Sequence, residues 1–157
     1  MVDLWSDEAT ADVAASPERV WSLVSDITRT GEWSPVCRRC EWLGDATSPE
    51  VGARFVGHNR QAGARWSREC VITASDPGKE FAFHTLFRGE EGTRWRYRFE
   101  STTDGTRVVE SYEMVAVPRW VATLQRLPGM SNRSRRETHR GLVRTLEGLK
   151  AAAEGGS

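Results

Sequence analysis

The chain has little that would support a secreted, metal-dependent or membrane-embedded protein. It contains three cysteines among 157 residues, whereas secreted disulfide scaffolds use an even number. No apolar run approaches the ~20 residues that a membrane-spanning helix needs. The N-terminal sequence MVDLWSDEATADV lacks the basic and apolar regions of a signal peptide. We therefore expect a cytoplasmic protein without stable membrane insertion.

An excess of charge of one sign is also lacking. The 22 basic and 22 acidic residues give a formal net charge of zero, so no overall field attracts nucleic acid or an anionic membrane. The basic run RSRRETHR at residues 133–140 is interrupted by Glu137 and contains no aromatic residue. We interpret it as a solvent-exposed helix face and expect no nucleic-acid partner. Phosphate loops, nucleophile elbows and paired-carboxylate motifs are missing as well, and we expect no cofactor.

Two of the cysteines, Cys37 and Cys40, form a Cys-x-x-C motif in the segment VCRRCEWL. The segment alternates like a β-strand, and side chains three apart on a regular strand point to opposite faces. On this interpretation the two thiols cannot bind one metal ion or form a local disulfide. The third cysteine and the three histidines occur singly, whereas a zinc site needs about four ligands. We expect neither a metal site nor a redox site.

Helical signals near the N-terminus are local and specific. Ser16 is a predicted N-cap and Pro17 stands at the first helical position. Apolar residues then recur at helical spacing as far as Ile27. The sequence EWSP at residues 32–35 predicts a second short helical turn before the next strand.

The C-terminal third predicts two more helices. A short apolar helix is expected over residues 118–127, and Pro128-Gly129 ends it. Ser131 or Asn132 is expected to cap a long helix that runs to about Ala153. The break between the two helices suggests the hypothesis that residues 118–130 move as a lid.

Between these helices the pattern is that of a β-meander. The segment TRWRYRFES is the clearest strand, because Trp95, Tyr97 and Phe99 alternate with three arginines. The turn signals DPG at residues 76–78 and DG at residues 104–105 separate strands. The predicted strands span residues 7–14, 36–43, 52–60, 64–75, 80–87, 93–101 and 106–115.

Strands grouped together with helices at both ends indicate an α+β fold with an antiparallel sheet. Such a sheet must bury one face, and the long C-terminal helix is the only predicted element large enough to cover it. A strongly curved sheet around one helix leaves a concave apolar space, which is a usual place for a ligand. We expect one domain over residues 1–154 and a disordered tail at residues 155–157.

Taken together, these segments resemble the helix-grip superfamily of START domains, the birch-pollen allergen fold and bacterial polyketide cyclase/dehydrase-like proteins. The segments that carry the resemblance are SPERVWSLVSD (16–26), EWSPVCRRCEWLG (32–44), GARFVGHNR (52–60), ITASDPGKEFAF (72–83), TRWRYRFES (93–101), GTRVVESYEM (105–114) and LVRTLEGLKAAAE (142–154). The resemblance implies a curved antiparallel sheet of about seven strands wrapped around a long C-terminal helix, with two short helices after the first strand.

The resemblance also implies a class of function. Members of the superfamily bind lipids, polyketides, sterols or hormones, and some catalyse aromatisation or dehydration. We therefore expect a monomer or homodimer that binds a small hydrophobic molecule between sheet and helix. The alternative is a polyketide aromatase/cyclase or dehydratase that uses acid and base residues in the same cavity. A third class, a protein-binding domain, would be marked by a large exposed apolar patch.

Strand alternation predicts the lining of the cavity, because charged residues mark the face of a strand that stays in water. Only the strand over residues 64–75 leaves the choice of face open. The predicted lining comprises Phe55, Gly57, Asn59, Trp66, Phe81, Phe83, Trp95, Tyr97, Phe99, Val108, Glu110, Tyr112, Met114, Leu127, Met130, His139, Leu142 and Leu146.

Glu110 is the most informative polar residue of this set. A carboxyl group inside an apolar cavity has a raised pKa because of desolvation, and acts as an acid or a hydrogen-bond donor. The alternative is a position at a strand end, or pairing with an arginine such as Arg65 or Arg68. Tyr97 and His139 are weaker candidates for acid–base chemistry. Convergence of two polar groups on one spot would favour an enzyme, and an all-apolar pocket a carrier.

Overall fold

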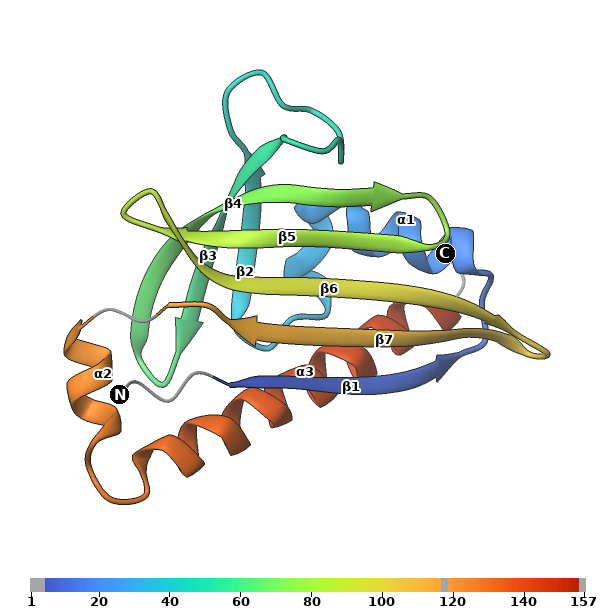
Figure 1. The fold of residues 1–157 in the computed structure, drawn as a ribbon. Helices are drawn as coiled ribbons and strands as arrows, with labels where there is room; N and C mark the ends of the chain where they lie inside the picture. The colour runs from blue at the N-terminus through green and yellow to red at the C-terminus, as the bar shows by residue number, and fades with distance from the viewer. Residues whose placement is uncertain (1–4, 117–118, 156–157) are drawn as a thin grey trace.

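The computed structural model describes residues 5–116 and 119–155. Seven antiparallel strands in the order β1-β7-β6-β5-β4-β3-β2 form one curved sheet (Figure 1). The strands are β1 (Ser6–Val13), β2 (Cys37–Trp42), β3 (Arg54–Gln61), β4 (Ala64–Asp76), β5 (Glu80–Phe87), β6 (Glu90–Thr102) and β7 (Gly105–Met114). The helices are α1 (Pro17–Ser25), the 3-10 helix η1 (Ile27–Glu32), α2 (Arg119–Gln125) and α3 (Met130–Glu154). The predicted helix-grip fold is confirmed.

The helix α1 begins where the sequence predicts. The Ser16 hydroxyl accepts a hydrogen bond of 3.2 Å from the backbone N–H of Arg19, and Pro17 occupies the first turn. The second short helix is displaced from its predicted place at residues 32–35. It forms earlier because the Asp26 side chain accepts a hydrogen bond from the Thr28 N–H and so caps η1.

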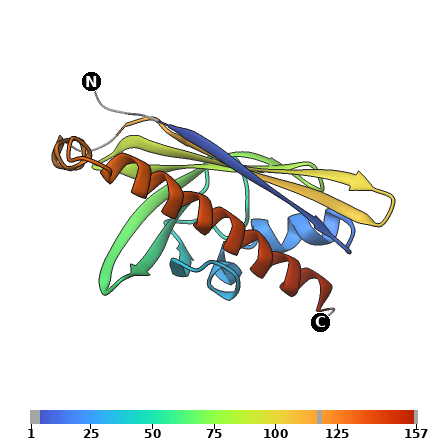
Figure 2. The ribbon, with the colours of Figure 1, turned by 90° about the horizontal axis from the view of Figure 1, so that it is seen from below.

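The long helix α3 lies across the concave face of the sheet (Figure 2). It starts at Met130 after Gly129, which adopts a left-handed conformation with φ of 79°. The predicted caps, Ser131 and Asn132, were therefore placed too late, since a glycine makes this turn without a Cβ penalty. Towards its C-terminal end the helix is fixed by burial of Leu146 and Leu149 in the main core with α1.

α3 approaches the segment after η1 so closely that only glycine fits at the crossing. A Cβ atom at Gly148 would lie 2.6 Å from the carbonyl oxygen of Trp33 and 2.9 Å from its Cα. Both are backbone atoms, so no side-chain rotation relieves the contact. The lack of a side chain at Gly148 therefore allows the C-terminal half of α3 to pack against the backbone of Trp33.

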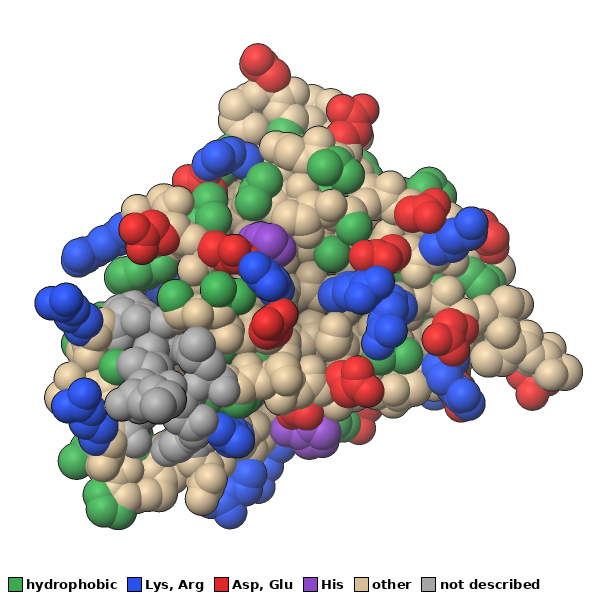
Figure 3. Space-filling model, in the orientation of Figure 1, with side chains coloured by type: hydrophobic (Ala, Val, Ile, Leu, Met, Phe, Trp, Pro, Cys, Tyr) green, Lys and Arg blue, Asp and Glu red, His purple; other side chains and the backbone are tan. Residues whose placement is uncertain are grey.

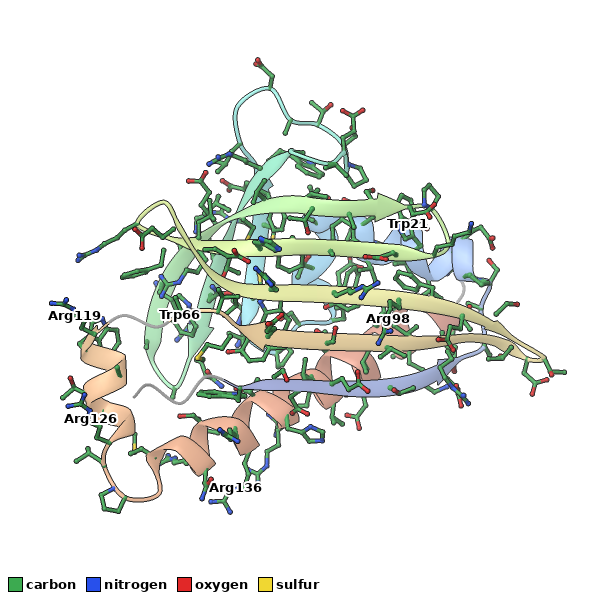
Figure 4. All side chains as sticks on the ribbon, viewed as in Figure 1. Trp21, Trp66, Arg98, Arg119, Arg126 and Arg136 are labelled. Carbon is green, nitrogen blue, oxygen red and sulfur yellow. The ribbon has the colours of Figure 1, made fainter. Side chains whose placement is uncertain are left out.

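The convex face of the sheet is charged and solvated. Acidic and basic side chains are intermingled over this face (Figure 3), and Arg98 on β6 is labelled there (Figure 4). Arg96 pairs with Glu80 at 3.0 Å, and Arg98 with Glu8 at 3.6 Å. Exposed pairs of this kind each contribute about 0–1 kcal/mol. These pairs instead mark the solvent-exposed face of β6.

Two predicted segments, the short helix from residue 118 and the C-terminal tail, lie only partly within the described residues. Residue 118, the expected start of the short helix, and residues 156–157 of the expected tail lie outside the described residues. Among the described residues, no helix combines the length and apolar character that crossing a membrane requires. The limits of the domain stay a prediction.

Candidate ligand-binding site

A cavity of about 470 Å³ lies between the concave face of the sheet and the N-terminal half of α3. Strands β2 to β7 supply its walls, together with η1 and the turn that follows it. Its volume falls within the range of about 300–1,000 Å³ that is usual for small-molecule sites. The C-terminal half of α3 packs tightly against the fold, whereas the N-terminal half covers this space.

A band of aromatic rings crosses the sheet side of the cavity. The centroids of Phe55 and Phe83 are 5.3 Å apart, those of Phe83 and Trp95 are 6.4 Å apart, and those of Trp95 and Tyr112 are 4.8 Å apart. The band joins strands β3, β5, β6 and β7 into one continuous apolar wall. Such a wall favours a flat or elongated apolar guest.

The structure places most of the predicted lining residues around this cavity. These are Phe55, Gly57, Asn59, Trp66, Phe81, Phe83, Trp95, Tyr97, Glu110, Tyr112 and Leu142. The open choice of face on β4 is resolved by Trp66, Arg68 and Cys70, which all point inward.

Other predicted lining residues lie elsewhere. Phe99, Val108 and Leu146 are buried in the main core, and Met114 packs in a smaller cluster with Tyr112 and Leu142. Leu127 is exposed, and Met130 is the partly buried first residue of α3. The exposed His139 has its Nδ1 atom 2.8 Å from the carboxylate of Asp7 on β1.

Sequence reasoning missed the polar and small residues that α3 contributes. They are Ser134, Glu137, Thr138, Gly141 and Thr145. Their spacing follows one helical face, so the periodicity that predicted the helix also contained this signal. The predicted lining included Leu142, Leu146 and His139 from this helix but not its small and hydroxyl-bearing residues.

Glu110 is the most deeply buried polar group of the cavity wall, with 1% of its surface exposed. Tyr97 lies directly opposite it across β6 and β7, and its hydroxyl donates a 2.8 Å hydrogen bond to Oε1 of Glu110. The other oxygen, Oε2, has no hydrogen-bond partner among the described residues. Tyr97, rather than an arginine, is thus the partner of this carboxyl group.

Burial is the main cause of the pKa shifts of Glu110 and Tyr97. Desolvation raises the pKa of Glu110 to about 8, and the hydrogen bond from Tyr97 opposes that rise. Desolvation and the proximity of Glu110 raise the pKa of Tyr97 as well. The raised pKa favours the protonated, neutral form of Glu110 at neutral pH. A neutral carboxyl group in this position can donate a hydrogen bond to a ligand or transfer a proton.

A β-bulge in β2 overturns the predicted arrangement of the Cys-x-x-C motif. The register of β2 against β3 shifts between Cys37 and Arg39, and one extra residue in a strand interrupts the alternation of faces. The two thiols therefore lie on the same face, with Sγ atoms 3.3 Å apart. Both line the cavity. The prediction that the two side chains point to opposite faces was wrong.

A larger hollow of about 790 Å³ lies on the convex face of the sheet. Charged side chains surround it and are already paired, Arg96 with Glu80 and Arg94 with Glu113. Within residues 5–116 and 119–155, no group of three or more potential ligands is arranged to hold a metal ion. The aromatic cavity with its buried carboxyl group is the better candidate for a binding site.

Basic side chains surround the outer surface of α2 and the start of α3. Arg119, Arg126 and Arg136 point away from the sheet (Figure 4), and Trp120 on α2 is 62% exposed. Arg133 in the basic run pairs with Glu137 at 3.1 Å. The arginines of the run at residues 133–140 are exposed, which agrees with its interpretation as a solvent-exposed helix face.

Residues 5–154 match the model of a family described as polyketide cyclase/dehydrase and lipid transport. A polyketide-cyclase-like protein from Corynebacterium glutamicum, solved by NMR, is 31% identical over 98% of this chain and 91% of that chain, with a TM-score of 0.55. No curated protein sequence shows significant similarity to the chain.

Two aromatase/cyclase structures share the fold. The Zhui aromatase/cyclase from Streptomyces sp. R1128 is 20% identical over 97% of this chain and 94% of that chain, with a TM-score of 0.73. The di-domain aromatase/cyclase StfQ of the steffimycin biosynthetic pathway is 16% identical, with a TM-score of 0.78. In that case the match covers 97% of this chain and 51% of StfQ.

Proposed function

Because the chain belongs to the polyketide cyclase/dehydrase and lipid transport family, we propose that its cavity binds a small, largely apolar molecule carrying a carbonyl or hydroxyl oxygen. One observation carries this proposal: the buried Glu110 has an oxygen atom without a hydrogen-bond partner among the described residues, in the wall of an aromatic cavity. A polar group left unsatisfied in the interior costs about 1–3 kcal/mol. A ligand oxygen next to Oε2 would remove that cost.

Affinity and orientation come from different parts of the site. Contact with the aromatic band contributes about 25 cal/mol for each Å² of apolar surface removed from water, before the costs of association. Glu110, oriented by Tyr97, fixes the direction of the oxygen-bearing end of the ligand. An analogue of the same shape without that oxygen is expected to bind about 5- to 100-fold more weakly.

A suitable test uses 1-naphthol and naphthalene as matched probes. Quenching of tryptophan fluorescence is expected to show tighter binding of 1-naphthol, because only its hydroxyl can pair with Glu110. Gly141 lines the cavity, and a Cβ atom at this position would meet no atom within 4 Å. The variant Gly141→Leu therefore extends a side chain into the cavity. It is expected to weaken binding of both probes by at least about tenfold.

Arg140→Leu is the matched control, because it adds the same leucine to an exposed neighbouring position on α3. It is expected to leave both affinities within about twofold of wild type. Equal losses in the two variants would refute binding in this cavity. Equal affinity for the two probes would refute the role of Glu110.

A second candidate function is proton transfer on a bound carbonyl compound, as in an aromatase/cyclase. The observation that favours it is the convergence of Glu110 and Tyr97 on one spot, with the pKa of Glu110 raised to about 8. A carboxyl group with a pKa near the working pH is suited to general acid–base catalysis. Glu110 as carboxylate would take a proton from the carbon next to the carbonyl group and return a solvent-derived one to it.

Hydrogen–deuterium exchange of 1-tetralone in deuterated water tests this second function by NMR. The wild-type protein is expected to accelerate exchange beside the carbonyl, increasingly as the pH rises towards about 8. Tyr97→Phe removes a hydrogen bond that lowers the pKa of Glu110, so its profile is expected to move to higher pH. Exchange that is equally fast with Glu110→Gln would rule out the proton-transfer role.

A further inference from the structure

The wall of the cavity holds a second reactive pair that neither proposed function uses. Cys37 and Cys40 are free thiols whose sulfur atoms lie 3.3 Å apart. Cys37 is partly exposed, whereas Cys40 has 6% of its surface exposed. Cys37 is thus the more exposed residue of the pair. We propose that Cys37 and Cys40 form a redox-active dithiol that small-molecule disulfides, such as glutathione disulfide, oxidise to an internal disulfide.

The local backbone explains why the two sulfurs can meet. The bulge between Cys37 and Arg39 adds one residue to β2, which interrupts the alternation and brings both side chains to one face. Gly57 on β3 lies opposite them, and a Cβ atom there would be 3.5 and 3.6 Å from the two sulfurs. A disulfide bond is about 2.05 Å long. The sulfurs therefore need to approach by only about 1.2 Å.

The electrostatics assign different roles to the two thiols. A hydrogen bond from the Cys40 thiol lowers the pKa of Cys37, as the backbone of Arg39 and His58 also does, against the opposing effect of burial. The same hydrogen bond and burial raise the pKa of Cys40. The thiolate is the nucleophilic form of cysteine. Cys37 is therefore the attacking sulfur, and Cys40 keeps its proton until the second step.

The reaction balances as two thiol–disulfide exchanges. The Cys37 thiolate attacks one sulfur of glutathione disulfide, forming a mixed disulfide and releasing one glutathione thiolate, which takes the Cys40 proton. The Cys40 thiolate then attacks the Sγ atom of Cys37, and the second glutathione leaves. The protein loses two electrons and two protons, and the glutathione disulfide is reduced to two thiols. No ligand in the cavity is required, so this inference stands independently of the proposed function.

Cys70 provides an internal control within the same cavity wall. It is buried and lines the cavity, but burial raises the pKa of its thiol to about 12. Its thiol donates a hydrogen bond to the carbonyl oxygen of Arg68, at 3.8 Å, and not to another thiol. Cys70 is therefore expected to remain reduced under conditions that oxidise the pair.

The experiment equilibrates the purified chain in glutathione buffers of increasing oxidised fraction. The remaining thiols are alkylated with N-ethylmaleimide in denaturant and counted by intact mass. The three free cysteines are expected to give three alkylated sites when reduced and one when oxidised. Peptide mapping is expected to place the single label on Cys70 and to find Cys37 joined to Cys40.

Single variants distinguish the two steps. Cys40→Ser is expected to stop at a stable mixed disulfide of Cys37 with glutathione, whereas Cys37→Ser is expected to remain unmodified. Cys70→Ser is expected to form the internal disulfide as the wild type does. Cys40→Ala replaces Cys40→Ser if circular dichroism shows that the serine variant is unfolded.

The rate of modification supplies a second criterion. At neutral pH, Cys37 in the folded Cys40→Ser variant is expected to react at least about tenfold faster than Cys70, because the serine hydroxyl can replace the hydrogen bond from Cys40. In Cys40→Ala that hydrogen bond is lost, and Cys37 is expected to react faster than Cys70 only through its greater exposure. The proposal is overturned if all three wild-type thiols remain alkylated throughout the glutathione series. Equal modification of Cys37 and Cys70, without an internal disulfide, would overturn it too.

Discussion

Replacing Glu110 with glutamine is expected to stabilise the protein progressively as the pH rises from about 5 to about 8. Over this interval the unfolding free energy of the variant should gain on the order of 3–4 kcal/mol relative to wild type. Denaturant titrations at several pH values, followed by circular dichroism, measure this difference. Most surface substitutions change stability by less than about 0.5 kcal/mol, so the effect is large.

The sign of the expected stability change follows from the different pKa of the Glu110 carboxyl group in the folded and unfolded protein. Burial raises the pKa of Glu110 from the ordinary 4.5 to about 8 in the folded protein. Between these values the folded state holds a proton that the unfolded state has already released. The favourable contribution is therefore complete below about pH 4.5 and is lost as the pH rises through about 8. Glutamine cannot ionise, and its amide oxygen can still accept the Tyr97 hydrogen bond.

Glu113→Gln is the matched control, since Glu113 is an exposed carboxylate three residues further along β7. An exposed carboxyl group keeps its contact with water on folding, so this variant should follow the wild-type pH dependence. A Glu110→Gln variant that tracks the wild type at every pH would mean that Glu110 is ionised and solvated. The proposed role of Glu110 as a buried hydrogen-bond donor would then fail.

Gly148→Ala is expected to lower the unfolding free energy by about 1–3 kcal/mol, although alanine favours helices over glycine by about 1 kcal/mol. The added methyl group would lie 2.6 Å from the carbonyl oxygen of Trp33. Relief of this contact requires α3 to move away from the segment after η1. Thermal and denaturant unfolding measure the loss.

Gly141→Ala in the same helix provides the opposite expectation. A Cβ atom at Gly141 meets no atom within 4 Å, so helix propensity alone predicts stabilisation by up to about 1 kcal/mol. The two variants should therefore differ in sign. Stabilisation by both would show that α3 does not approach Trp33 as closely as the structure places it.

The fold followed from the sequence because strong local signals agreed with one another. The alternation of Trp95, Tyr97 and Phe99 with arginines fixed which face of β6 is buried, and the charge pairs on the convex face are its counterpart. Ser16 and Pro17 fixed the start of α1. These features depend on neighbours in sequence, and a single chain contains them in full.

Other features could not be predicted from the sequence, because they depend on tertiary contacts or on a shift of strand register by one residue. The bulge beside Cys37 reverses the faces of the residues after it, and nothing in VCRRCEW distinguishes a regular strand from a bulged one. Gly148 has the same sequence context as any helical glycine until Trp33 is placed against it. Glu110 was identified by its inward position, but its partner Tyr97 required the register of β6 and β7.

The most direct test of the central claim is the location of bound 1-naphthol by NMR of the tryptophan side chains. Trp33, Trp66 and Trp95 line the cavity, whereas Trp120 is exposed on α2 and Trp21 donates its indole N–H to the Glu80 carbonyl oxygen. Titration should shift the indole signals of the first three and leave those of Trp21 and Trp120 in place. Shifts confined to Trp120, or saturation without any change at Trp95, would contradict a ligand site between sheet and helix.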